Sequence, residues 1–331
     1  MIIEEKPDRN NSPEWWAERC NKILEEQKGT WALLESNYQN LAKVQTREFS
    51  FDDFQVKIQF NPDRITFSPS DETTETIKTR KCNLCIDNLP AEQSGLNYNK
   101  HFVILTNPQP TFPEHFTISK KNHLAQTIIG NFAEFLEISR ALGKFYTTFY
   151  DGPKCGSSVP DHMHFHAGTK QILPVEYEFE KLVGKLSRTV ISNGKIEVRF
   201  FEEHLRYFIS FESRDKGELL FAFKTFCNAF KKISLPHNEP FMNLISSYQE
   251  GIWRLLIFPR QKHRPTQFSS EEENQLLISP AAVDMGGLFI TPREEDFEKI
   301  TKDDVIDIFK QVTITKEYFE FLRKKIGEIF I

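Results

Sequence analysis

Histidine occupies every second position of the run HMHFH, at residues 162, 164 and 166, with Met163 and Phe165 between them. Side chains of a β-strand alternate between its two faces, so a strand here turns both apolar residues to one face and the imidazoles to the other. The chain must then bury one face in a core and keep the other for chemistry, because three adjacent imidazoles pack poorly. Imidazole serves as nucleophile, proton donor or metal ligand near neutral pH. The pattern predicts that His162, His164 and His166 share one side of a strand at a reactive site.

A segment shortly before this strand, residues 151–158, is typical of a loop. Its sequence, DGPKCGSS, is rich in residues that form turns. Small hydroxyl side chains and exposed backbone N–H groups in such a loop can hold an anion. Ser157 and Ser158 come closest to the histidine run, which predicts a phosphate-binding loop beside a nucleophile.

Cys82 and Cys85 form a C-x2-C pair, the spacing with which two thiolates bind one tetrahedral zinc. No second such pair follows, so other side chains must complete a metal site. His115 and His123 are both candidates for the third ligand, and His162 is the candidate for the fourth. A redox pair or two inert thiols are the alternatives, but no thioredoxin-like strand and helix start surround the pair. We expect a structural zinc.

These motifs resemble those of the histidine-triad superfamily, specifically its galactose-1-phosphate uridylyltransferase-like branch. That branch also holds the diadenosine tetraphosphate phosphorylases and the GDP-hexose phosphorylases. Its members carry H-x-H-x-H or H-x-H-x-Q on a strand, and the second histidine attacks the α-phosphate of a nucleotide. The resemblance implies that His164 is the nucleophile. It implies that His166 forms a hydrogen bond to the phosphate or protonates the leaving group.

The resemblance also implies a set of ligands and binding residues. The metal ligands it implies are Cys82, Cys85, His123 and His162. His123 fits better than His115, because it follows a strand-like run at the place where the family's ligand histidine lies. The substrate-binding residues it implies are Ser157, Ser158 and Arg64, although Arg64 could equally be a charged residue of a solvated loop.

The resemblance extends loosely from residue 51 to the end of the chain. Residues 107–118 are similar to the hairpin that leads to the ligand histidine, and residues 279–297 to the closing segment of GDP-hexose phosphorylases. The third motif position departs from this pattern. Transferases and phosphorylases of the branch usually have glutamine there, whereas His166 is typical of the nucleotide hydrolases in the wider superfamily.

These features predict a nucleotidyltransferase or phosphorylase that acts on a nucleotide sugar or a dinucleotide polyphosphate through a covalent nucleotidyl-histidine. The partners would be the nucleotide and a phosphate or sugar-phosphate acceptor, and the resemblance allows a homodimer. One alternative is a nucleotide hydrolase that uses the same histidine. The other is a zinc-stabilised nucleotide-binding protein without turnover.

Composition is consistent with a cytoplasmic enzyme. The formal net charge of −5 argues against general nucleic-acid binding, which requires basic surfaces. The five cysteines are odd in number and sparse, which suits a reducing compartment. The first residues are too polar for a signal peptide, and no apolar run has membrane-spanning length. We therefore expect no membrane partner.

Hydrophobic periodicity predicts helices capped by Ser12 and Thr30 and a strand over 51–60. Further elements are expected as strands at 102–106, 116–119, 196–200 and 207–211, helices near 132–138 and 219–230, and a hairpin of 241–248 with 252–258. The run PRQKHRP at 259–265 could supply positive charge to a phosphate, but we expect a solvated loop.

The expected fold class is α+β, with two histidine-triad-like halves. Each half would hold an antiparallel sheet with helices, and only the first would carry the histidine motif. The division is expected as a helical segment at 1–45, a catalytic half at 46–170 and a second half at 171–331. The family resemblance implies this duplication, because the internal sequence similarity is too faint to reveal it.

Overall fold

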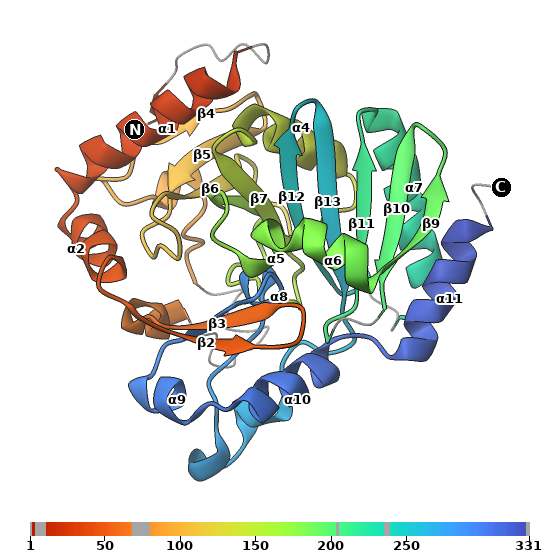
Figure 1. Ribbon diagram of the computed structural model, residues 1–331. Coiled ribbons are helices and arrows are strands. Elements are labelled where there is room, and N and C mark those ends of the chain that lie inside the picture. The colour runs from red at the N-terminus through yellow and green to blue at the C-terminus, as the bar shows by residue number, and fades with distance from the viewer. Residues whose placement is uncertain (1, 4–10, 68–79, 203–204, 235–238, 329–331) are drawn as a thin grey trace.

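The computed structural model describes residues 2–3, 11–67, 80–202, 205–234 and 239–328. One eleven-stranded sheet runs through both halves of the chain (Figure 1). Its strands, in spatial order, are β1 (Ile2–Ile3), β4 (Gly95–Asn97), β5 (Phe102–Thr106), β6 (His115–Lys120), β8 (His164–Thr169), β7 (Tyr146–Asp151), β12 (Met242–Gln249), β13 (Ile252–Pro259), β11 (Phe208–Ser213), β10 (Ile196–Phe201) and β9 (Ser187–Ser192).

Neighbouring strands of this sheet are antiparallel, except that β1 and β4 are parallel. Strands β1 to β8 come from the first half of the chain, and β9 to β13 come from the second. The two sets meet where β7 pairs with β12, from Asn243 opposite Asp151 to Ser246 opposite Thr148. The predicted α+β class with two antiparallel halves is confirmed, and the sheets of the two halves are joined edge to edge.

Helices α1 (Pro13–Lys28), α4 (Phe132–Leu142), α7 (Lys216–Phe230) and α11 (Lys316–Gly327) cover one face of the sheet and bury a large apolar core. A further helix on this side, α2 (Ala32–Leu41), follows α1. The helices present their apolar stripes to the sheet, as Phe135 and Leu136 do on α4. Figure 1 shows α7 behind the strands and α5 and α6 in front of them.

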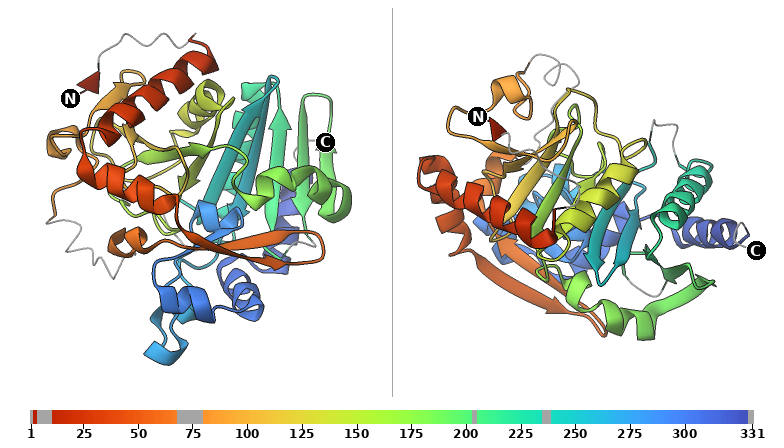
Figure 2. Two further views of the ribbon diagram at one scale, coloured as in Figure 1. Left: turned by 60° about the vertical axis from the view of Figure 1, so that its left-hand side comes forward. Right: turned by 90° about the horizontal axis from the view of Figure 1, so that it is seen from above.

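The opposite face is covered by a second layer with its own core. A three-stranded sheet lies here, in which β3 pairs antiparallel with β2 and parallel with β14. Figure 2 shows the β2–β3 hairpin, coloured orange, beside the blue C-terminal elements. This layer and its connections contain β2 (Gln45–Ser50), β3 (Gln55–Phe60), β14 (Leu288–Thr291), α5 (Pro174–Tyr177), α6 (Phe179–Leu186), α8 (Ala282–Met285), α9 (Glu294–Lys299), α10 (Lys302–Val312), and the 3-10 helices η1 (Pro62–Phe67), η2 (Ile86–Asn88), η3 (Thr266–Ser269) and η4 (Glu272–Asn274).

Most expected elements lie where the periodicity places them, and two differ at their ends. Ser12 caps α1 by accepting the N–H of Trp15 at 3.3 Å, as predicted. The predicted cap at Thr30 is wrong, because its hydroxyl donates back to the carbonyl of Glu26 and α2 begins later. The expected strand over 51–60 begins at residue 55, because residues 51–54 form the turn of the β2–β3 hairpin.

The expectation of a solvated loop at 259–265 is wrong for its first arginine. Arg260 is 1% exposed, and its guanidinium donates five hydrogen bonds. One reaches Asn243 Oδ1 at 2.6 Å, and the amide of Asn243 in turn donates to Asp151 Oδ1 at 2.8 Å. Because all five N–H groups of this buried guanidinium donate hydrogen bonds, Arg260 stabilises the junction between β7 and β12.

Among the helices of the described residues, none combines the length and apolar composition needed to cross a membrane.

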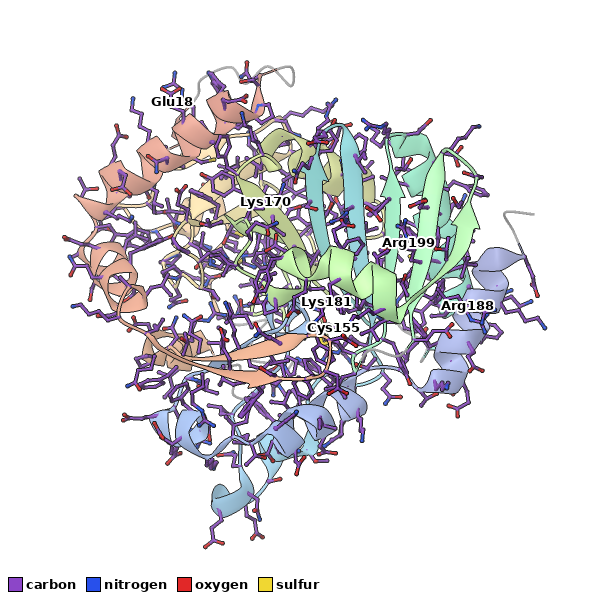
Figure 3. The ribbon with its side chains drawn as sticks, viewed as in Figure 1. Glu18, Cys155, Lys170, Lys181, Arg188 and Arg199 are labelled. Carbon is purple, nitrogen blue, oxygen red and sulfur yellow. The ribbon has the colours of Figure 1, made fainter. Side chains whose placement is uncertain are left out.

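Arg260→Met should lower the free energy of unfolding by about 3 kcal/mol or more, since it leaves several buried acceptors without a donor. Urea unfolding measures the change. Arg188→Met is the matched control, because Arg188 is exposed on the edge strand β9 near α11 (Figure 3) and its replacement should cost less than about 0.5 kcal/mol. Equal losses in the two variants would contradict a structural role for Arg260.

Candidate active site

The histidine strand separates a core from a cavity, as its alternation predicts. Met163 and Phe165 are fully buried in the core under the helices. His164 and His166 turn to the other side, where they line a cavity of about 440 Å³ beneath the small sheet and α8. The cavity wall includes Trp31, Arg64, Asn83, Leu84, Gln93, Asn107, Gln109, His115, Phe149, Asp151, Gly156, Ser158, Ser279, Ala281, Asp284 and Ile290.

The ring of His164 is held in one orientation. Its Nδ1 lies 2.7 Å from the carbonyl oxygen of His162, to which it donates. Its backbone N–H donates to Gln126 Oε1 at 2.8 Å, and the amide of Gln126 donates to the carbonyls of His164 and Asp151. Because the proton of the neutral ring sits on Nδ1, Nε2 carries the lone pair. Burial lowers the pKa of His164 to about 4, so the imidazole is neutral and nucleophilic at pH 7.

His166 lies beside this ring and is also held without charge. The two ring centroids are 5.0 Å apart at 88°, and His166 stacks on Phe149 at 5.1 Å. Burial, with His164, His115 and Arg64 nearby, holds the pKa of His166 well below its usual value. A neutral imidazole beside His164 can donate a hydrogen bond to a phosphate oxygen.

The loop before the strand reaches the cavity through Gly156 and Ser158. Gly156 has φ +96°, and a Cβ there would lie 2.5 Å from Cβ of Ala281, so the loop packs directly against the segment before α8. Ser157 is not part of the cavity wall, and its hydroxyl is buried without a hydrogen-bond partner. The same loop holds Cys155, labelled in Figure 3.

Arg64 brings a positive charge to the cavity. It belongs to η1, lines the cavity and donates to the carbonyl of Gln109 at 3.2 Å. Asp284 and Asp151 interact with it electrostatically. The alternative of a solvated loop charge therefore does not describe this arginine.

Three residues of the cavity wall were not predicted as part of the catalytic site. Asp151 accepts the N–H of Ala282 at 2.6 Å, and burial raises its pKa to about 6. Asp284 accepts the N–H groups of Ala281 and Ile290, and burial raises its pKa to about 7. For His115 the sequence predicted only a possible role as a metal ligand. Both aspartates lie in segments that the sequence singled out, but nothing in the sequence places those segments face to face.

The two cysteines and two of the histidines meet beside the cavity. Cys82 Sγ lies 3.2 Å from Nδ1 of His162, and Cys85 Sγ lies 3.2 Å from Nδ1 of His123 and 3.6 Å from Nδ1 of His162. All four ligand atoms lie within 4.8 Å of one another. A tetrahedral zinc with bonds of about 2.3 Å to sulfur and 2.0 Å to nitrogen holds its ligand atoms about 3.3–3.8 Å apart. The four residues fit such an ion.

Nε2, the second ring nitrogen of each histidine in this cluster, also lies near a polar group. His162 Nε2 donates to the carbonyl of Lys120 at 2.6 Å, which leaves Nδ1 free for a metal. His123 Nε2 lies 3.8 Å from the carboxylate of Asp161, which is paired with Arg80 at 2.6 Å. His115 lies in the cavity wall next to His166 instead. The geometry therefore favours His123 over His115, as the family pattern implies.

Comparisons with known proteins agree with this fold. Residues 23–169 match a family model described as a domain of unknown function, DUF4922, and residues 189–330 match the model described as GDPGP1-like, C-terminal domain. No curated protein matches the chain. The yeast Ap4A phosphorylase Apa2 has a similar structure. The crystal structure of that enzyme gives a TM-score of 0.58 at 14% identity, and the match covers 86% of this chain and 96% of that chain.

The same yeast enzyme in complex with AMP gives a TM-score of 0.57 at 14% identity, covering 87% of this chain and 93% of that chain. The enzyme in complex with Ap4A gives a TM-score of 0.53 at 15% identity, and this match covers 86% of this chain and 96% of that chain. The resemblance to the galactose-1-phosphate uridylyltransferase-like branch, which the motifs indicated, is confirmed.

Asp284→Asn should change how stability depends on pH. An unfolded aspartate has a pKa of about 3.9, so between about pH 4 and 7 the folded protein keeps a proton on Asp284 that the unfolded chain releases. That contribution to stability is complete below about pH 4 and is lost as the pH rises through 7. Asparagine cannot ionise, so Asp284→Asn should gain about 3 kcal/mol relative to wild type from pH 5 to pH 8.

Urea unfolding of the nucleotide-free protein at several pH values measures this difference. Asp303→Asn is the matched control, because Asp303 is exposed on α10 and its effect should be constant across the range. A constant difference for Asp284→Asn as well would show that Asp284 does not titrate in this window.

Proposed function

We propose that the chain is a phosphorylase-type nucleotidyltransferase that forms a covalent nucleotidyl intermediate on His164. The observation that carries this proposal is the hydrogen bond from Nδ1 of His164 to the carbonyl of His162, in a ring that lines the cavity. The match of residues 189–330 to a GDPGP1-like domain supports it. The similarity in fold to a yeast Ap4A phosphorylase that binds AMP and Ap4A also supports it.

The reaction proceeds in two displacements. In the first, Nε2 of His164 attacks the α-phosphorus of the nucleotide, and the bond from that phosphorus to the bridging oxygen breaks. A nucleotide sugar would release a hexose 1-phosphate, and a dinucleotide tetraphosphate would release a nucleoside triphosphate. In the second, an oxygen of inorganic phosphate attacks the nucleotidyl-histidine, frees Nε2 and gives a nucleoside diphosphate. A sugar phosphate could take the place of inorganic phosphate.

Residues around His164 stabilise the charge that shifts onto the phosphate oxygens. Ser158, the backbone of the Gly156 loop and Arg64 line the cavity, and in this proposal they bind the non-bridging oxygens and supply positive charge. Ser157 of the same loop is buried outside the cavity wall, so it would not contact the phosphate directly. His166 donates a hydrogen bond to the transferred phosphate.

The cluster of Cys82, Cys85, His123 and His162 would hold one structural zinc. When bound, the zinc supplies a fixed cross-link between the C-x2-C loop and the start of the histidine strand. His162 then positions its own carbonyl, which accepts the hydrogen bond of the nucleophile. Asn83 and Leu84, between the cysteines, line the cavity, so the metal loop is also a wall of the site.

We also propose the division into a catalytic half at 46–170 and a second half at 171–331, after a helical segment at 1–45. The order of strands on either side of the β7–β12 junction supports it.

His164→Ala should lower turnover by at least about 10³-fold with the fold unchanged, since it removes the attacking atom. A panel of nucleotide sugars and dinucleotide polyphosphates is incubated with and without phosphate, and products are separated by chromatography. A nucleoside diphosphate that appears only with phosphate indicates transfer, and a nucleoside monophosphate at every phosphate concentration indicates hydrolysis. His101→Ala, at an exposed histidine, is the control. Turnover that survives in folded His164→Ala protein would exclude the assignment.

Freshly purified protein should contain about one zinc per chain by elemental analysis, and Cys82→Ser should lose it together with thermal stability. His123→Ala should lose the metal, whereas His115→Ala should retain it, because His115 lies outside the cluster. Wild-type protein that carries no metal before any exposure to chelators would remove the site from the proposal.

A further inference from the structure

His115 and His166 form a pair of imidazoles in the cavity wall that the proposed reaction leaves unexplained. They come from the neighbouring strands β6 and β8, and their ring centroids are 5.3 Å apart at 51°. Each ring has one buried nitrogen without a hydrogen-bond partner, Nε2 in His115 and Nδ1 in His166. Buried polar atoms of this kind normally have partners, so two in neighbouring rings require an explanation.

The proton of His115 can be assigned. The backbone N–H of Thr111 donates to Nδ1 of His115 at 3.2 Å, so Nδ1 must present its lone pair. His115 is 3% exposed, and burial lowers its pKa to about 3, so the ring is neutral at pH 7. Its single proton therefore sits on Nε2, the nitrogen that lacks an acceptor.

Aromatic neighbours restrict both rings. Phe112 lies edge-on to His115 at 5.4 Å and 82°, and Phe149 stacks on His166. Gly168, opposite His115 in the strand register, leaves room for Phe112, because a Cβ there would lie 2.5 Å from that ring. Among the aromatic rings that contact His115 in the described residues, which are Phe112, Phe149 and His166, only His166 offers a hydrogen-bond acceptor.

We propose that His115 is a positioning residue that donates its Nε2–H to Nδ1 of His166 and so fixes His166 as the tautomer with its proton on Nε2. In this arrangement each of the two nitrogens, which have no other hydrogen-bond partner in the structure, satisfies the other. The inference rests on the proposed function in one respect, namely that His166 contacts the transferred phosphate. It assigns to His115 a role in that reaction and no contact with the substrate.

The fixed tautomer determines which hydrogen bonds His166 can form in the cavity. A neutral imidazole with a fixed Nε2–H presents one hydrogen-bond donor to the cavity, as an amide side chain would. It orients a phosphate oxygen and delivers no proton, since a second proton would have to enter a buried site between His115, His164 and Arg64. His166 therefore suits transfer of the nucleotidyl group, and its presence does not make the chain a hydrolase.

The tautomer can be tested without any activity. Protein labelled with ¹⁵N in its histidines gives long-range ¹H–¹⁵N spectra that distinguish Nδ1–H from Nε2–H rings, and the His166 signals are those missing in His166→Gln. Wild type should show His166 as the Nε2–H tautomer. His115→Phe should give a mixture, and His115→Gln, which keeps a donor, should restore the wild-type pattern. An unchanged His166 signal in folded His115→Phe protein would overturn the inference.

Kinetics of phosphate-dependent turnover test the same coupling. His115→Phe should lower kcat about tenfold with KM within twofold, the effect of misorienting one neutral hydrogen bond. In the His166→Gln background the side chain at 166 has no ring tautomer to fix, so His115→Phe should lower kcat by less than about twofold. Equal losses in both backgrounds would show that His115 acts through something other than His166. A wild-type protein inactive on every substrate would contradict the proposed function, and the spectra would still decide the tautomer.

Discussion

The hydrogen bond between Nδ1 of His164 and the carbonyl of His162 connects the parts of the site. It leaves the lone pair on Nε2, and it depends on a backbone segment that is itself fixed by the side chain of His162. That side chain lies between Cys82 Sγ and the carbonyl of Lys120. The cluster of Cys82, Cys85, His123 and His162 is therefore connected to Nε2 of His164, because His162 orients the ring of His164 through its own backbone carbonyl.

The large sheet provides the rigidity that this unit requires. β8 lies between β6 and β7, so both of its edges are hydrogen-bonded and its apolar side chains are held in the helix-covered core. The other layer is assembled from distant segments, since β14 and α8 of the second half lie over the histidines of the first. The first half supplies the histidines of the cavity, and residues of the second half close the cavity over them.

The histidine strand, the C-x2-C pair and most helices were predictable because each depends on spacing along the chain. Met163 and Phe165 alternate with the histidines, and that pattern alone fixes which face is buried. The role of His115 was not predictable, because its surroundings come from Thr111, Phe112 and a ring on the next strand. Asp151 and Asp284 became part of the site only through contacts across 131 to 133 positions of chain, which periodicity does not encode. Arg260 was expected in a solvated loop, because the sequence does not show how many carbonyl groups accept hydrogen bonds from its guanidinium.

The parallel pairing of β3 with β14 has a consequence for how the molecule is made. It joins Lys57 to Leu288 and Phe60 to Thr291, so the small sheet cannot be completed until residues 288–291 have left the ribosome. The histidine strand, both cysteines and the Gly156 loop all emerge well before that. The histidines are therefore synthesised before the strand and helix that cover them, and contacts of such long sequence separation form slowly. The closed cavity is thus a late product of folding, although the residues of the histidine strand are made early.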